Sequence, residues 1–213
     1  MSVSEPAVAL DRDADAPPAR PTAWQLLMNN RLAAAGFWIM ALIVVLSVLE
    51  PVLPLEDPDA TSLAERLAPV LSDGHLLGTD HLGRDTLARL FSGMRVSLVV
   101  GVTASLIAAF FGSLIGLIAG YARGRVDNIL MRGIDMLMAF PYILLALAIV
   151  AALGPGLMNA LIAVAAVNVP FFARNIRGIT VGLAGREFID AARLAGMGHT
   201  RIILTELLPN VLP

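Results

Sequence analysis

The sequence predicts an all-α polytopic membrane protein, and two observations support that prediction. Of its 213 residues, 57% are hydrophobic and only 15% are charged, whereas soluble domains carry roughly 25% charged residues. The apolar residues also gather in four long runs, each near the roughly 20 residues that a membrane-spanning helix needs. A chain of this composition requires lipid around much of its surface, so a soluble globular protein is excluded.

The first 31 residues form a polar segment ahead of the apolar runs. It is rich in Ala, Pro and Asp, and its early charges are mostly acidic. A signal peptide instead begins with basic residues that lead directly into an apolar run. We therefore predict that residues 1–31 are an uncleaved, disordered tail. Trp24 either lies with the last turns of this tail at the membrane interface or has no special role.

Each of the four apolar runs is predicted to cross the membrane as one helix. The predicted spans are residues 32–49, 96–120, 136–153 and 157–173. Gly154-Pro155-Gly156 separates the last two and predicts a tight turn between them. Pro141 and Pro170 remove backbone hydrogen bonds from these two spans and permit kinks there.

The arginines predict the orientation of the spans, because cytoplasmic flanks of membrane helices collect basic residues. Three arginines separate the second span from the third, and five follow the fourth. The loop at residues 50–95 holds four arginines over a much longer stretch, together with eight acidic residues. We therefore expect a cytoplasmic N-terminus, an outer loop at 50–95 and a cytoplasmic segment at 174–213.

The spans themselves contain almost no ionisable side chains. Asp135 and Arg95 lie at span edges, where contact with the interface explains them. Carriers driven by protons or ions usually keep ionisable groups at membrane depth, so ion-coupled transport by this chain is disfavoured. Gly112, Gly116 and Gly120 line one face of the second span. Such a stripe allows close helix contact in lipid, either as fixed packing or between helices that slide during gating.

Two readings are open for the outer loop. Imidazole and carboxylate groups ligate divalent cations, so a metal site would use His75, Asp80, His81 and Asp85. The favoured reading is a structured turn in which Asp85 caps a short helix over residues 86–91. We accordingly expect no metal site.

Several other activities are excluded by residues that the sequence lacks. All 15 basic residues are arginine, so the chain has no phosphate loop of its own, which needs a lysine, and no lysine Schiff base. Without cysteine there is no disulfide framework or thiolate metal cluster. No concentrated basic patch points to nucleic acid. We expect no cofactor and no catalytic residue.

The cytoplasmic segment predicts two short helices separated near Gly196-Met197-Gly198. The first covers about residues 185–195, with an apolar face of Phe188, Ala191, Ala192 and Ala195. Thr200 would cap the second, which stops at Pro209. From periodicity alone this amphipathic pair could float on lipid, pack internally or bind a soluble partner.

The same segment carries a motif with defined spacing. Asp190-Ala191-Ala192 is followed after three residues by Gly196, and Leu208-Pro209 complete the pattern. It resembles the EAA motif (EAA-x3-G-x9-I-x-LP) of permease subunits of bacterial ABC importers. Asp190 stands for the motif's glutamate, and Glu206 stands for its isoleucine. Residues 75–98, 135–148 and 175–197 resemble the second permease of dipeptide, oligopeptide and nickel importers, so the resemblance covers about residues 22–213.

The resemblance implies a fold, partners and a mechanism. The fold would be that of a type I ABC importer permease, with residues 1–31 as cytoplasmic tail, 32–94 as first helix and periplasmic loop, and 95–213 as transmembrane core. The motif would form a coupling knob that docks on a cytoplasmic ATPase. The chain would lie in the bacterial inner membrane, and its partners would be a second permease, cytoplasmic ATP-binding subunits and an extracytoplasmic solute-binding protein. ATP would be hydrolysed on the separate subunits.

The resemblance leaves two points open, which are the transported cargo and the number of membrane spans. Peptides are the expected cargo, and nickel or a glutathione-like solute is the alternative within the family. Such permeases have about six spans and this sequence holds four, so we infer a fragment or a shortened gene product. A four-span scaffold that recruits a cytoplasmic partner is the alternative from another class.

Overall fold

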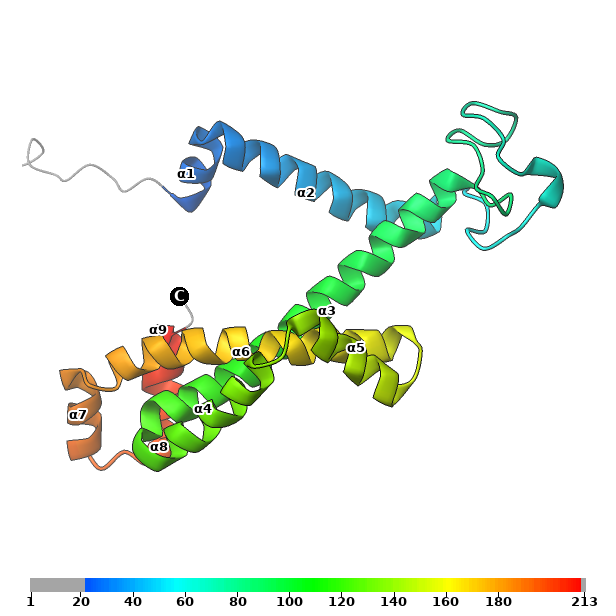
Figure 1. Ribbon diagram of the computed structural model, residues 1–213. Coiled ribbons are helices and arrows are strands. Elements are labelled where there is room, and N and C mark those ends of the chain that lie inside the picture. The colour runs from blue at the N-terminus through cyan, green and yellow to red at the C-terminus, as the bar shows by residue number, and fades with distance from the viewer. Residues whose placement is uncertain (1–21, 212–213) are drawn as a thin grey trace, which may run out of the picture. The chain divides into compact units, whose positions relative to one another are not determined.

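A computed structural model describes residues 22–211 of the chain (Figure 1). Most of the predicted disordered tail, residues 1–21, lies outside the described residues. The chain divides into two compact units, Met1–Leu55 and Glu56–Pro213. In the first unit, α1 (Ala23–Asn29) leads into the apolar helix α2 (Arg31–Leu49) and a single 3-10 turn, η1 (Glu50–Val52).

Helix α1 begins at a complete capping box. The Thr22 hydroxyl accepts a hydrogen bond from the Gln25 amide, and the Gln25 side chain accepts one from the Thr22 amide. Trp24 makes an edge-to-face contact with Phe37 of α2, with ring centroids 5.3 Å apart. Because this aromatic pair joins α1 to α2, Trp24 has a packing role within this unit.

The second unit holds the remaining candidate spans. They are α3 (Thr86–Ala122), α4 (Gly124–Met138), α5 (Tyr142–Leu153) and α6 (Leu157–Leu183). Together with Arg31–Val52 of the first unit, α3 and α6 are long and apolar enough to cross a membrane. At 37 residues, α3 is about 55 Å long, well beyond the roughly 30 Å hydrocarbon core. The separate helix predicted at 86–91 is simply the first part of α3, which Asp85 caps as expected.

The structure corrects the third predicted span, residues 136–153. Helix α4 ends at Met138, α5 begins at Tyr142, and the pair bends by 91° at the break, as a broken span or re-entrant loop would. Pro141 lies at this break as the N-cap of α5. Its ring supplies no N–H and disfavours helical geometry in the preceding residue, so the hydrogen-bond ladder cannot continue. By contrast, α6 runs through Pro170 and on to Leu183.

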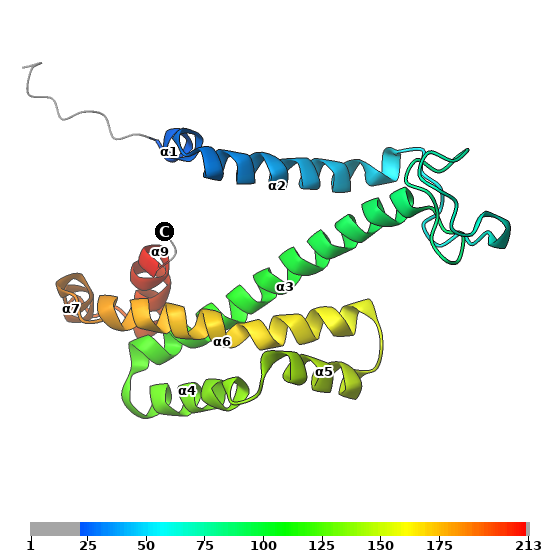
Figure 2. The same cartoon turned by 45° about the horizontal axis from the view of Figure 1, so that its top comes forward.

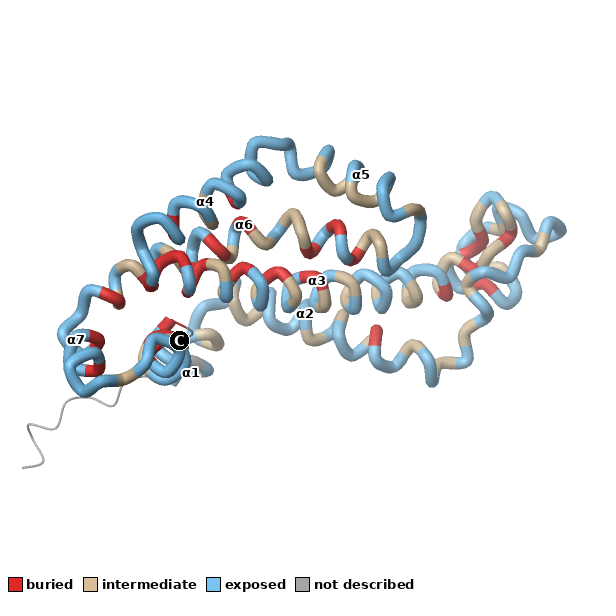
Figure 3. The backbone as a smooth tube through the Cα atoms, turned by 90° about the horizontal axis from the view of Figure 1, so that it is seen from below, coloured by how far each residue is buried: buried red, intermediate tan, exposed pale blue. Residues whose placement is uncertain are grey.

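Helices α3 and α6 make the most extensive helix–helix contact of the second unit, and they cross in both views (Figures 1 and 2). Five buried positions of α3 recur every four residues and carry only alanine or glycine. They are Ala104, Ala108, Gly112, Gly116 and Gly120. Small side chains let the backbones approach closely, which is how helices gain van der Waals contact in lipid. Figure 3 shows the buried residues concentrated along this contact.

Three glycines of α3 leave no room for a side chain against α6. A Cβ atom on Gly116 would lie 2.6 Å from the Ala173 carbonyl oxygen and 2.9 Å from the Arg177 nitrogen. At Gly112 it would lie 2.7 Å from a carbonyl oxygen, and at Gly120 2.7 Å from Thr180 Cβ. The close helix contact that both readings of the glycine stripe require is therefore present between α3 and α6.

Helix α4, which the sequence analysis treats as a loop, is amphipathic. Its inner face includes the buried Asp127 and Ile134. Asp127 accepts two hydrogen bonds from the Arg177 guanidinium of α6, at 2.5 and 2.6 Å. Asp135 pairs with Arg174 at 2.5 Å. Thus Asp135 has a specific partner, and two ion pairs fasten α4 to the last turns of α6.

The turn between α5 and α6 has the predicted form. Gly154 and Gly156 adopt φ angles of +92° and +142°, which glycine reaches without a steric penalty. The Asn159 side chain donates hydrogen bonds to the Leu153 and Gly154 carbonyls at the end of α5. Asn159 therefore stabilises the turn between the two helices.

The α3–α6 contact generates a first prediction. Gly116→Ala should lower the free energy of unfolding by about 1–3 kcal/mol, the usual cost of overpacking, because its Cβ would press on the α6 backbone. Thermal unfolding of the detergent-solubilised protein measures the effect. Gly101→Ala is the matched control, since nothing lies within 4 Å of its added Cβ; equal stability of both variants would contradict the contact.

Candidate functional site

The segment that carries the motif folds back onto the ends of α3 and α6. After α6 come α7 (Glu187–Leu194), α8 (His199–Arg201), the π-helix η3 (Ile202–Leu207) and α9 (Leu208–Val211). Ile189, Ile202 and Leu207 are completely buried. They form one hydrophobic core with residues of the two long helices, including Leu117 of α3 and Ile176 of α6. The segment is therefore packed firmly against α3 and α6.

Gly196 ends α7 in a Schellman turn. Its φ is +78°, its amide donates to the Arg193 carbonyl at 3.0 Å, and the Met197 amide donates to the Ala192 carbonyl at 3.1 Å. These are the two hydrogen bonds that define this motif. The motif glycine is thus explained by local backbone geometry, because the positive φ favours a residue without Cβ.

The six predicted site residues do not share one surface. Ala192 is buried in the core, and Leu208 packs against that core. Asp190, Ala191, Gly196 and Pro209 are exposed. Of the four residues predicted to form the docking knob, Asp190, Ala191 and Gly196 are exposed and Ala192 is buried, so the motif contains residues that hold the segment in place and residues that face outward.

The outward face of α7 is partly apolar. Leu194 is 90% exposed and Phe188 37% exposed, and Ala191 and Ala195 are exposed beside them. The apolar set predicted from the sequence is thus divided: Ala192 is buried together with Ile189, and its other three members are exposed. An exposed apolar face of this kind is typical of a surface that meets a partner.

The second predicted helix differs in its ends and its geometry. Gly198, and not Thr200, occupies the N-cap position of α8. The chain then continues through one π-helical stretch into α9, so Pro209 does not end the helix. Glu206 lies in this stretch, half-buried, at the position where the motif has isoleucine. π-Helical turns are rare and occur frequently at functional sites.

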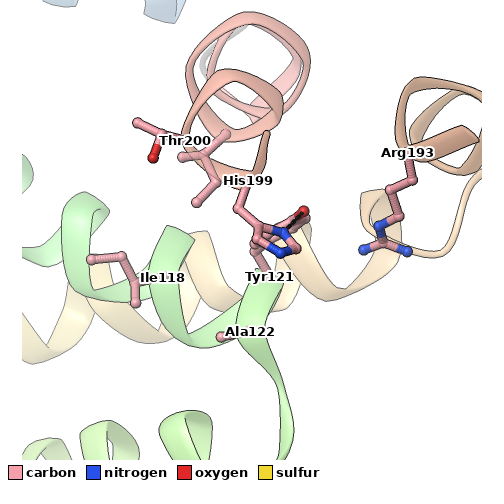
Figure 4. A pocket seen from close by; sticks show the side chains of 7 residues that line it. Ile118, Tyr121, Ala122, Arg193, His199 and Thr200 are labelled. Carbon is pink, nitrogen blue, oxygen red and sulfur yellow. Dashed lines mark hydrogen bonds between the residues drawn. The ribbon is translucent and has the colours of Figure 1, made fainter. Parts of the chain in front are cut away.

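A cluster that the sequence analysis missed joins α3 to this segment (Figure 4). The Tyr121 hydroxyl and His199 Nδ1 are hydrogen-bonded at 2.8 Å. The Arg193 guanidinium lies over the Tyr121 ring, 5.3 Å from its centroid, and pairs with Asp190 at 3.0 Å. Tyr121 follows an apolar run and His199 lies 78 residues later, so no spacing rule relates them. The one indication in the sequence was that Tyr121, an aromatic residue with a polar hydroxyl, stands at the end of a predicted span.

The outer loop forms a hydrogen-bonded turn. The buried His75 Nδ1 and Asp85 Oδ2 are 2.9 Å apart, and Asp85 Oδ1 accepts the Ala88 amide at 2.7 Å to cap α3. Asp80 instead binds backbone amides and Arg89, and His81 is exposed. Within residues 22–211, no three His, Cys, Asp or Glu side chains are grouped to hold a metal ion.

Two families match the chain in sequence. Residues 112–213 match the family described as binding-protein-dependent transport system inner membrane component. Residues 22–69 match the N-terminal TM domain of oligopeptide transport permease C.

Named relatives agree with these matches. A dipeptide transport system permease protein DppC from Alkalihalophilus pseudofirmus is 43% identical over 89% of this chain and 62% of its own length. The Bacillus subtilis DppC is 36% identical over 99% of this chain and 63% of its own. A glutathione transport system permease protein GsiD from Pectobacterium atrosepticum is 37% identical over 88% and 62%. The chain thus spans under two thirds of the length of these relatives.

The turn at Gly196 generates a prediction. Gly196→Ala should loosen the end of α7 by roughly 1–2 kcal/mol, the cost of the left-handed conformation for a residue with Cβ. Hydrogen exchange should then show about tenfold less protection of the Met197 amide. Gly198→Ala is the control, because Gly198 has φ −67° and open space around its Cβ position. Equal protection in both variants would contradict the Schellman geometry.

The outer loop generates a pH prediction. The hydrogen bond with Asp85 raises the pKa of His75 above its ordinary value, burial opposes this, and Glu56 and Glu65 add to the rise. A raised folded pKa contributes stability that is fully present below the unfolded pKa of about 6.5 and is lost as pH rises through the folded pKa. Protection of the Ala88 amide should fall over that window. His75→Gln should remove this pH dependence, and the control His81→Gln should keep it. If the pH dependence persisted in His75→Gln, His75 would not be its cause.

Proposed function

The chain belongs to the family of inner-membrane components of binding-protein-dependent transport systems, and on that premise we propose that it is a permease subunit of an ATP-driven peptide importer. In this role it lines part of a translocation path and catalyses no covalent chemistry. Its several apolar helices support a location in the bacterial inner membrane. The relatives named for dipeptide transport support peptides as the cargo.

The proposed mechanism rests on one observation about α7. One face of this helix is buried against the membrane helices, and the other face is exposed. The buried face joins the core that α3 and α6 contribute to. The exposed face, with Leu194 and Ala191, has the apolar character of a docking surface. A partner ATPase that binds the exposed face and moves would therefore move the ends of α3 and α6, and the translocation path that the membrane helices line would reorient.

The proposed partners follow from this mechanism. Cytoplasmic ATP-binding subunits hydrolyse ATP and bind α7, a second permease completes the path, and an external solute-binding protein delivers the cargo. The N-terminus and residues 174–213 are then cytoplasmic, and 50–95 are external. The outer loop and the α7–α9 segment lie at opposite ends of α3, which supports this orientation (Figure 2). The division into 1–31, 32–94 and 95–213 is kept as part of this proposal.

Within the motif, we assign the coupling role to two groups of residues. Asp190 and Ala191 face the partner ATPase, and Gly196 forms the turn that ends the helix carrying them. Ala192 and Leu208 hold the segment against the membrane helices, and the exposed Pro209 follows Leu208 in α9. This division is supported by the buried position of Ala192 and by the contact of Leu208 with the core.

The test uses the natural chain with its partner subunits in proteoliposomes. Leu194→Arg should reduce ATP-dependent dipeptide uptake at least about tenfold, since a charge at the centre of a docking surface removes hot-spot contacts. Leu194→Met is the matched control and should transport normally. Both variants should reach the membrane in equal amounts, because Leu194 is 90% exposed in the chain itself.

Three other results would overturn the proposal. Normal uptake by Leu194→Arg would remove the docking role of α7. Uptake of Ni²⁺ or glutathione without dipeptide uptake would show that peptides are not the cargo. Absence of any ATP-dependent uptake by the assembled complex, with α7 still binding a cytoplasmic protein, would favour a membrane scaffold.

A further inference from the structure

Tyr121 occupies a position where three helices meet. It is the second-last residue of α3, is 9% exposed, and belongs to the core under the motif segment. Its hydroxyl reaches His199 on α8, and its ring lies under Arg193 on α7. A single side chain of a membrane helix therefore contacts both arms of the segment, on either side of the turn at Gly196.

The Arg193 contact is itself held in place. Asp190, three residues earlier on α7, accepts a hydrogen bond from Arg193 Nη1 at 3.0 Å. This pair orients the guanidinium toward the ring face, where the negative quadrupole of the aromatic ring attracts a cation. The acidic residue of the motif thus acts on Tyr121 through Arg193.

These contacts differ in kind from the apolar core around them. Hydrophobic burial is non-directional, so the core holds the segment against α3 and α6 by close packing and supplies few directional contacts. A hydrogen bond requires a narrow range of distance and angle, and a cation over a ring requires proximity to its face. The Tyr121 contacts therefore select one position of the segment relative to α3.

Space for an alternative position lies beside the cluster. A cavity of about 500 Å³ is lined by Tyr121, His199, Arg193 and Thr200 together with apolar residues of α3 and η3 (Figure 4). This space adjoins both arms of the segment, through Arg193 on one side of the turn and His199 on the other. A close-packed core without such space would leave no room for a second position.

We propose that Tyr121 is a positioning residue that fixes the motif segment to the end of α3 through His199 and Arg193, so that movement of the segment is passed to the membrane helix. The contact is a property of this chain alone. Its consequence for transport rests on the proposed function, and the two parts are tested separately.

The first experiment measures position in the assembled complex without transport. The chain has no cysteine, so Leu114→Cys on α3 and Leu204→Cys on η3 provide two unique sites for spin labels, both on exposed side chains. Tyr121→Phe should broaden the distribution of distances between the labels. Tyr142→Phe, which removes a hydroxyl from a 68% exposed tyrosine, should leave it unchanged. An unchanged distribution in Tyr121→Phe would overturn the proposal.

The second experiment measures peptide transported per ATP hydrolysed. Tyr121→Phe and His199→Leu should each lower this ratio about fivefold, the factor for one hydrogen bond. His199→Asn should restore it, since an amide keeps a hydrogen-bonding atom near the place of Nδ1. A merely structural role would lower uptake and ATP hydrolysis together and leave their ratio unchanged, which would overturn the proposal.

The two experiments separate the proposal from its premise. If the wild-type complex transports no peptide, the proposed function fails and the distance measurement alone decides the role of Tyr121. If the wild-type complex transports peptide and the ratio is the same in Tyr121→Phe and Tyr142→Phe, the proposed function stands and the positioning role is wrong.

Discussion

The close approach of α3 and α6 is the constraint on which the second unit depends. In lipid, two apolar helices gain little by leaving their acyl-chain neighbours, so they associate through tight van der Waals contact. Alanine and glycine at every fourth position of α3 make that contact possible. Because the contact runs to the ends of both helices, it also creates the platform formed by Leu117, Tyr121, Ile176 and Ala184.

The platform explains why the short segment that follows α6 has one side attached to the membrane helices and one side exposed. Completely buried side chains such as Ile189 and Ile202 attach it to both helices, while Leu194 remains outside. The Schellman turn at Gly196 reverses the chain so that α8 returns to Tyr121. Apolar packing, one hydrogen bond and one cation–π contact together make the segment a rigid attachment to α3 and α6, as a device that transmits movement requires.

Sequence reasoning predicted the elements best where a single local property decides them. The turn at Gly154–Gly156, the cap at Asp85 and the membrane helices follow from hydropathy, turn residues and capping. It failed at α4, because two arginines and two aspartates interrupt the apolar pattern there, and the ion pairs of the two aspartates form only against α6. It also missed the inward direction of Ile189 and the pairing of Tyr121 with His199. Those depend on the tertiary platform, which local periodicity does not contain.

Labelling of adjacent alanines on α7 tests the central claim most directly. Single cysteines replace Ala191, which is exposed, and Ala192, which is 8% exposed, in a chain without native cysteine. With a membrane-impermeant thiol reagent on the cytoplasmic side, the account predicts fast labelling at Ala191→Cys that the partner ATPase suppresses. It predicts slow labelling at Ala192→Cys in either state. Equal labelling at both positions, or labelling of Ala191→Cys that the ATPase does not change, would contradict a segment with one face on the membrane helices and the other on a partner.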